Sequence, residues 1–108
     1  MIEPLKLYIL VRSDLSTSQR TVQACHALAN LMLHHNHDLK LRKWAEQYRT
    51  LIILAVENLH HLNLWEEELR VREILCEHFA EPDLNSEKTA LAVHPCADTK
   101  LFNGLRLL

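Results

Sequence analysis

The chain has 108 residues and 48% of them are hydrophobic, which is enough for one buried core and too little for two ordinary domains. A formal net charge of -2 argues against a protein that coats nucleic acid by bulk attraction, and a single glycine, Gly104, excludes glycine-rich phosphate loops. The start, Met1-Ile2-Glu3-Pro4, lacks the features of a secretory signal, and no apolar run approaches the roughly 20 residues that cross a bilayer, so we expect a cytoplasmic protein.

The first half of the chain predicts a strand, two helices and a second strand. Leu5–Val11 is a short apolar run typical of a buried strand. Hydroxyls at positions 16–18 are candidate N-caps for a helix that reaches about His34. One side of this helix is predicted to pack on the sheet, namely Val22, Cys25, Ala29 and Met32.

The second helix is expected to begin at Asp38 as its N-cap. Its buried stripe recurs at helical spacing and comprises Leu41, Trp44, Ala45 and Tyr48. Thr50–Val56 then reads as an interior strand, covered on both faces. A crossover of this length favours parallel pairing of the two strands, with a right-handed connection.

The second half predicts a helix over positions 58–72, with Leu62, Trp65 and Leu69 buried and Glu66, Glu67 and Arg70 exposed. Strands are expected at 74–79 and 88–93, separated by a loop at 81–86. The close of the chain, from Asp98 to Leu108, is expected to hold a short helical turn and an apolar tail that covers a sheet edge. One three-layer α/β/α domain accounts for residues 1–108.

Four polar side chains form a stripe along the first helix, at steps of four, three and four: Gln19, Gln23, His26 and Asn30. Burying them is costly unless each finds a partner. The stripe is therefore either a functional face or a solvated one, with His26 bonded to a nearby backbone carbonyl.

Metal binding has weak support in the sequence. His34, His35 and His37 are close together but point in different directions on a helix, which favours a solvated helix end, and we interpret His60 and His61 in the same way. The three cysteines, Cys25, Cys76 and Cys96, form no CxxC pair and are expected to be reduced thiols. A basic cluster on the second helix is either an exposed face or a contact for an RNA backbone; it comprises Lys40, Arg42, Lys43 and Arg49.

Several motifs together resemble one family. Leu7–Asp14 followed by Gln23-Ala24-Cys25-His26-Ala27 resembles the opening of the archaeal and eukaryotic type of peptidyl-tRNA hydrolase, in which Arg-x-Asp-Leu leads to a helix with Gln-x-x-His-Ala. Thr89–Pro95 is similar to that family's Thr-x-Leu-Ala-Ile-x-Pro strand, and Leu105–Leu108 resembles its closing strand. The resemblance spans nearly the whole chain.

The resemblance implies a mixed sheet of about four strands flanked by helices. It also implies cleavage of the ester between a peptide and the terminal ribose of tRNA, which needs a positioned water, a base and donors to the oxyanion, and no cofactor or metal. By this resemblance Gln23 and His26 line the site and Thr89 contributes a hydroxyl. Arg12 and Asp14 shape the loop beneath it, or form an ordinary loop ion pair.

The sequence departs from the family at two positions in the expected site. A glycine- and lysine-rich loop is replaced by Ser16–Arg20, so that Gln19 and Arg20 occupy the start of the helix; Arg20 keeps a positive charge for a phosphate but cannot transfer a proton. The family's Asp-Ala-Gly-x-Thr segment is replaced by a shorter loop, in which Asp83 or Glu81 is the candidate acidic base unless the segment is only a turn.

Three functional hypotheses follow from these observations. The first is a peptidyl-tRNA-hydrolase-like enzyme with tRNA as partner. The second is a binding module on the same fold, which recognises a small ligand, an RNA end or a protein. The third is a homodimer with its function at the interface, because the terminal segment is apolar.

Overall fold

The computed structural model describes residues 4–96 and 100–108, which form a mixed sheet between two helical layers. The predicted start of the last helical turn at Asp98 lies outside the described residues. In chain order the elements are β1 (Lys6–Arg12), α1 (Thr17–His34), α2 (Leu39–Lys43), a π-helical turn (Trp44–Tyr48), β2 (Thr50–Val56), α3 (Leu59–Val71), β3 (Cys76–Glu81), a 3-10 turn (Pro82–Leu84) and β4 (Glu87–Val93). The predicted fold class is confirmed.

The sheet has the order β2-β1-β4-β3. β1 and β2 are parallel, as the length of the crossover predicts, whereas β4 pairs antiparallel with both β1 and β3. The closing segment also joins the sheet, because Ala55 N donates to Arg106 O at 2.8 Å and Leu108 N donates to Ile53 O at 3.0 Å. The apolar tail therefore covers the outer edge of β2, as predicted.

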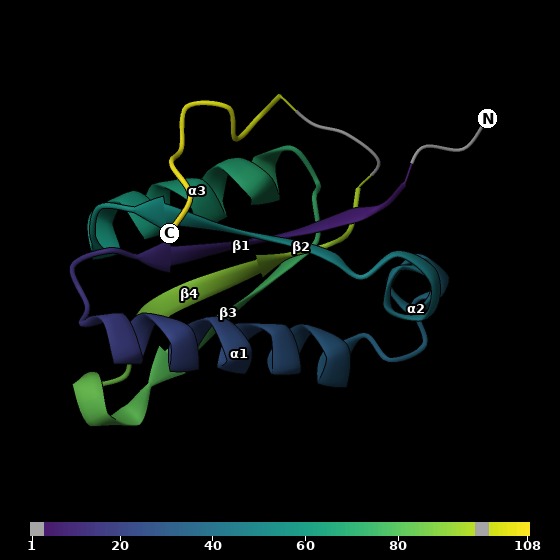
Figure 1. Cartoon of the computed structure of the whole chain (residues 1–108). Helices are drawn as coiled ribbons and strands as arrows, with labels where there is room; N and C mark the ends of the chain where they lie inside the picture. The colour runs from purple at the N-terminus through teal and green to yellow at the C-terminus, as the bar shows by residue number, and fades with distance from the viewer. Residues whose placement is uncertain (1–3, 97–99) are drawn as a thin grey trace.

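Helix α1 covers one face of this sheet and α3 covers the other (Figure 1). A hydrophobic core lies on each face. On the α1 face, alternate residues of β1 pack against small and branched residues of α1: Leu7, Ile9, Val11, Ala24, Ala27 and Leu31. On the α3 face the other residues of β1 pack with α3 and the closing segment: Tyr8, Leu10, Leu62, Leu69 and Phe102. This alternation is the mark of a strand that is covered on both sides.

The buried side of α1 differs from the predicted one. Val22, Cys25 and Ala29 are exposed, and the side that packs on the sheet contains Gln23, Ala24, Ala27 and Leu31. At 100° per residue these two sets lie on nearly opposite sides of the helix. The alanines let α1 approach the sheet closely, and Gln23 is tolerated there because its amide is hydrogen-bonded.

The side chain of Glu66 also differs from its predicted exposure, because it lies between α3 and the sheet. Its carboxylate binds Lys88 Nζ of β4 and His78 Nδ1 of β3, each at 2.6 Å. Glu66 follows Leu62 by four residues and precedes Leu69 by three, so helical spacing already puts it on the buried stripe.

The N-cap predicted for α2 is confirmed, since Asp38 accepts a hydrogen bond from Leu41 N at 2.8 Å. His94 Nε2 lies 2.8 Å from the same carboxylate, and the pKa of Asp38 is lowered chiefly by this hydrogen bond. No helix in the described part of the chain is both long and apolar enough to span a membrane.

Candidate active site

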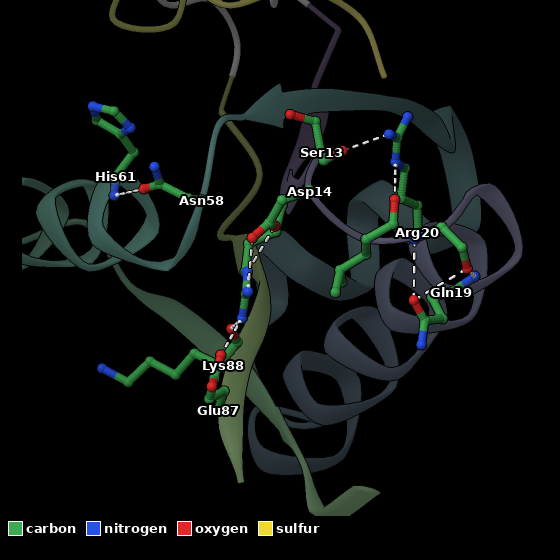
Figure 2. A network of polar contacts seen from close by, with 11 residues as sticks. Ser13, Asp14, Gln19, Arg20, Asn58, His61, Glu87 and Lys88 are labelled. Carbon is green, nitrogen blue, oxygen red and sulfur yellow. Dashed lines mark hydrogen bonds and ion pairs between the residues drawn. The ribbon is translucent and has the colours of Figure 1, made fainter. Parts of the chain in front are cut away.

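Arg12 ties the end of β1 to the start of β4. Its guanidinium, nearly buried at 8% exposed, donates to both carboxylate oxygens of Asp14 at 3.0 and 2.9 Å. It also donates to Glu87 Oε1 at 2.9 Å and to the carbonyl of Lys88 at 3.1 Å (Figure 2). Hydrogen bonding to Arg12 lowers the pKa of Asp14, and the same bond raises the pKa of Arg12, so both groups stay charged.

The Arg12–Asp14 pair lies at the end of β1 and in the loop that leads to α1. Val11 faces α1, so the alternation of β1 turns Arg12 towards the α3 face. The side-chain hydrogen bonds of the pair join Arg12 to Asp14, Glu87 and Lys88, while the charge of Arg20 in α1 also helps to lower the pKa of Asp14.

Arg20, in the first turn of α1, hydrogen-bonds to two backbone carbonyls of the loop between β1 and α1. Its Nε donates to the carbonyl of Leu15 at 2.8 Å, and Nη2 donates to the carbonyl of Ser13 (Figure 2). A guanidinium has five N–H donors, so three of them are left for another acceptor.

Gln19 caps the N-terminus of α1 together with Ser16. Ser16 Oγ accepts from Gln19 N at 3.3 Å and Gln19 Oε1 accepts from Ser16 N at 3.0 Å, which is a capping box. The hydroxyl predicted as N-cap is thus that of Ser16, and the Gln19 side chain is already used by the helix.

Gln23, Thr89 and Glu81 meet between α1 and the sheet. Thr89 Oγ1 donates to Gln23 Oε1 at 2.6 Å, and Gln23 Nε2 donates to Glu81 Oε2 at 3.3 Å. Gln23 is 4% exposed and Thr89 is fully buried, whereas Glu81 is half-buried. Gln23 of α1 and two residues of the β3–β4 hairpin, which is distant from α1 in sequence, therefore form one hydrogen-bonded group.

A β-bulge turns Thr89 towards α1. Phe79 pairs with Ala90 and Ala80 pairs with Lys88, which leaves Thr89 as an extra residue in β4. Lys88 consequently faces α3, where it binds Glu66, while Thr89 and Ala90 both face α1. Bulges re-aim side chains in this way and recur beside active sites.

His26 and Asn30 continue the polar stripe along β3. The His26 ring is exposed and stacks on Phe79, with ring centroids 4.4 Å apart and planes 20° apart. Asn30 Nδ2 donates to the carbonyl of His78 at 3.2 Å. Each member of the stripe thus finds a partner, and His26 is the one that offers an exposed ring beside Gln23.

The two predicted acidic groups are in different positions. Glu81 ends β3 and binds Gln23, while Asp83 is exposed in the 3-10 turn that follows. Asn85 and Ser86 both have positive φ, 56° and 59°, and Ser86 N donates to the carbonyl of Glu81 at 2.9 Å. This tight turn returns the chain to Glu87 and fixes the position of Glu81.

The other histidines make ion pairs or stay exposed. His34 Nδ1 and His35 Nε2 lie 3.4 and 2.9 Å from the carboxylate of Glu77 in β3, so they are not only a solvated helix end. His37 is exposed. Among residues 4–96 and 100–108, no three His, Cys, Asp or Glu residues cluster as a metal site.

The candidate site is therefore smaller than predicted. The structure brings Gln23, Thr89 and Glu81 into contact, with His26 one helical turn further on. Gln19 and Arg20 hold the start of the helix, and Arg12 and Asp14 join the loop after β1 to the start of β4. Sequence reasoning missed Phe79, the platform for His26, for which alternation along β3 was the available signal.

Comparisons with known proteins agree with this architecture. The family model described as "Peptidyl-tRNA hydrolase PTH2" matches residues 5–108. Among solved structures, a protein of unknown function from Agrobacterium tumefaciens strain C58 has the same fold, with a TM-score of 0.69, 11% identity, and coverage of 97% of this chain and 98% of its own. No curated protein matches the sequence.

Proposed function

The chain belongs to the peptidyl-tRNA hydrolase PTH2 family, and from that premise we propose that it hydrolyses the ester between a peptide and the terminal ribose of tRNA. The observation that carries this proposal is the buried Gln23–Thr89 hydrogen bond beside the exposed His26. These are the residues that the family resemblance assigns to the site.

His26 is the general base in this proposal. An ester is already labile, so the protein needs mainly to orient a water, accept its proton and stabilise the negative charge that develops on oxygen. The imidazole is exposed on a rigid ring platform, and histidine is the side chain most often used for such proton transfer.

Thr89 and Gln23 are positioning residues. Thr89 is fully buried, so its hydroxyl acts through Gln23 and fixes which end of the amide faces Glu81. Because an amide nitrogen carries two hydrogens, Gln23 Nε2 holds Glu81 and keeps one N–H for the reacting group. Glu81, rather than the exposed Asp83, is then the carboxylate that accepts a hydrogen bond from the attacking water.

Arg20 supplies charge to the site. It remains protonated and gives two N–H groups to loop carbonyls, so its remaining donors are suited to a phosphate of the tRNA terminus. The basic cluster of Lys40, Arg42, Lys43 and Arg49 follows the other end of α1, a helix about 27 Å long for its 18 residues at 1.5 Å each. An RNA helix that extends from the site along α1 would pass that cluster.

Hydrolysis of an N-acetylated aminoacyl-tRNA tests the proposal. We expect His26→Ala to lower kcat by about 10²- to 10⁴-fold, the usual contribution of a general base. The matched control is His37→Ala, an exposed histidine beyond the end of α1, which should leave kcat unchanged. A wild-type chain that leaves the substrate intact, at concentrations where a lysine-bearing family member clears it, contradicts the enzymatic function.

A binding module is the second candidate, and two observations favour it. Gln23 and Thr89 are both buried and hydrogen-bonded to each other, and the glycine- and lysine-rich loop of the family is replaced by Ser16–Arg20. In that case the same surface recognises an RNA end, a small ligand or a protein without turnover. Loss of RNA binding in His26→Ala, with no hydrolysis by wild type, supports the module over the enzyme.

The proposal also includes where the protein acts and whether it forms a homodimer. We expect the protein to act in the cytoplasm, where peptidyl-tRNA is made. A homodimer stays a prediction, although part of the apolar tail that motivated it pairs with β2 of its own chain. A strictly monomeric sedimentation profile would contradict it.

A further inference from the structure

A crevice opens where β1 and β2 end. These neighbouring strands are parallel, yet the helices that follow them, α1 and α3, lie on opposite faces of the sheet (Figure 1). The two connecting loops therefore diverge, and in open α/β sheets such a divergence marks the usual place for a ligand. Here it holds a hollow of about 240 Å³, whose lining includes Ser13, Glu57, His61, Trp65, Leu105 and Arg106.

This hollow is separate from the Gln23–His26 site. The loop after β1 lies between them, with the carbonyl of Ser13 bound to Arg20 on the α1 side (Figure 2). Asn58 and His61, at the start of α3, lie on the other side of that loop in the same view.

Two charged side chains line the hollow, those of Arg106 and Glu57. Among the described residues, the Arg106 guanidinium has no hydrogen-bond or ion-pair partner, while its backbone carbonyl is fixed by Ala55 N. The Glu57 side chain is 80% exposed directly after β2, and its carboxylate lies 3.4 Å from His61 Nδ1. That nitrogen is buried from water and has no hydrogen-bond partner, although buried polar atoms normally have one.

The hollow also has an aromatic wall. The Trp65 indole is half-buried and is braced by Phe102, with ring centroids 5.2 Å apart and planes inclined by 50°. Leu105 lies beside it in the lining. A braced indole at the surface offers a π-face on which any nucleobase can stack.

Together these groups match the parts of a nucleotide. A carboxylate directly after the second parallel strand is the group that binds ribose hydroxyls in nucleotide-binding sheets, an indole stacks the base, and a guanidinium pairs with a phosphate. With a single glycine the chain has no loop to cradle a diphosphate. We propose that this crevice binds a nucleoside monophosphate with free 2′- and 3′-hydroxyls, either as a free nucleotide or as the last nucleotide of an RNA.

The inference goes beyond ester hydrolysis and does not depend on it. Binding is measured without turnover, so a chain that binds nucleotides but hydrolyses no ester satisfies this inference and fails the proposed function. A chain that hydrolyses the ester but binds no nucleotide in the crevice satisfies the proposed function and contradicts this inference.

Amide chemical shifts of the full chain, titrated with AMP, GMP, CMP and UMP, test the inference. We expect saturable shifts at the amides of Ser13, Glu57, Trp65 and Arg106. Glu57→Gln and Arg106→Gln should each weaken binding about tenfold, as expected for loss of a hydrogen bond to a charged group. The matched controls are Glu67→Gln and Arg70→Gln, an exposed ion pair of α3 outside the lining of the hollow, which should bind like wild type.

Two short RNAs separate the sources of the nucleotide. An oligonucleotide with a free 3′ end should bind in the crevice if the ligand is an RNA terminus, and the same oligonucleotide with a 3′-phosphate should bind at least tenfold more weakly because Glu57 loses the diol. Binding of mononucleotides without RNA identifies a free nucleotide. The inference is overturned if no mononucleotide or RNA gives saturable shifts in the crevice, or if well-folded Glu57→Gln and Arg106→Gln variants bind as wild type does.

Discussion

At the scale of single residues, the bulge in β4 decides what Thr89 contacts. Without the extra residue, strict alternation would turn Thr89 towards α3, away from Gln23. The bulge thus converts a strand threonine into the hydrogen-bond donor of the candidate site. Its hydroxyl lies 2.6 Å from Gln23 Oε1 and 3.3 Å from the carbonyl of Phe79, and the shorter contact is with the amide.

Thr89→Val tests the energy of this contact, since valine has nearly the shape of threonine. The substitution leaves the buried Gln23 oxygen without its donor, so we expect the free energy of unfolding to fall by about 1–3 kcal/mol in urea titrations. The double variant Thr89→Val, Gln23→Leu should lose less than the sum of the two single variants, because both partners are then apolar. Strictly additive losses would show that the two side chains do not stabilise each other.

The sequence motifs point to the residues of the candidate site, but they do not predict which contacts those residues make. Family motifs pointed to Gln23, His26 and Thr89, but no pattern in the sequence marks a bulge, and a shift of one residue changes the face of a strand side chain. The face of α1 was predicted wrongly for a related reason. Both sides of the helix carry apolar residues, and the choice between them depends on tertiary contacts of Gln23 with β3 and β4.

At the scale of elements, α3 is joined to the sheet by one carboxylate as well as by its apolar side. Burial disfavours ionised Glu66, but the hydrogen bonds and attraction of Lys88 and His78 outweigh burial and lower the pKa of Glu66. Its ionised form is therefore favoured by folding. This contact links α3 to both β3 and β4, the two strands that also form the Gln23 site.

Glu66→Gln should lower stability in a way that depends on pH. The pKa is lower in the folded chain than the reference of about 4.3, so the contribution is present above about pH 5 and is lost as pH falls through the folded value. Since Lys88 and His78 are partly exposed, we expect a loss of about 1 kcal/mol at pH 7 that shrinks as the pH is lowered through the folded pKa of Glu66, measured by urea unfolding. Glu67→Gln, at an exposed position paired with Arg70, is the control and should differ little from wild type. A difference that stays constant from pH 7 to pH 3 would contradict this role of Glu66.

Burial and the nearby carboxylate of Glu66 determine the protonation state of the Cys76 thiol. Burial raises the pKa of its thiol to about 11, and the negative charge of Glu66 acts in the same direction. The thiol therefore stays protonated at neutral pH. All three cysteines are free of disulfide bonds, as the prediction of reduced thiols requires.

At the scale of the whole molecule, the sheet has two edges that are protected differently. The outer strand β3 carries Glu77, His78 and Glu81, and its pairing with β4 is interrupted by a bulge between Phe79 and Ala80; charged side chains and bulges both discourage pairing with another sheet. The other outer strand, β2, is an apolar run with no charged side chain, and the closing segment covers it. The sequence predicted an edge-covering tail and the parallel β1–β2 pair, but strand order depends on long-range pairing that local patterns do not encode.

Removal of residues 105–108 should therefore convert β2 into an open edge. The deletion frees Ala55 N and the carbonyl of Ile53, both now bonded to the closing segment, along an apolar strand that can pair with another copy. We expect concentration-dependent oligomers in light scattering that wild type does not form under the same conditions. Leu107→Ser is the control, because its side chain is 74% exposed and the substitution keeps the backbone pairing. If the shortened chain scatters like wild type at every concentration, backbone pairing by the tail is not what keeps this edge closed, and protection must come from the twist of β2 itself.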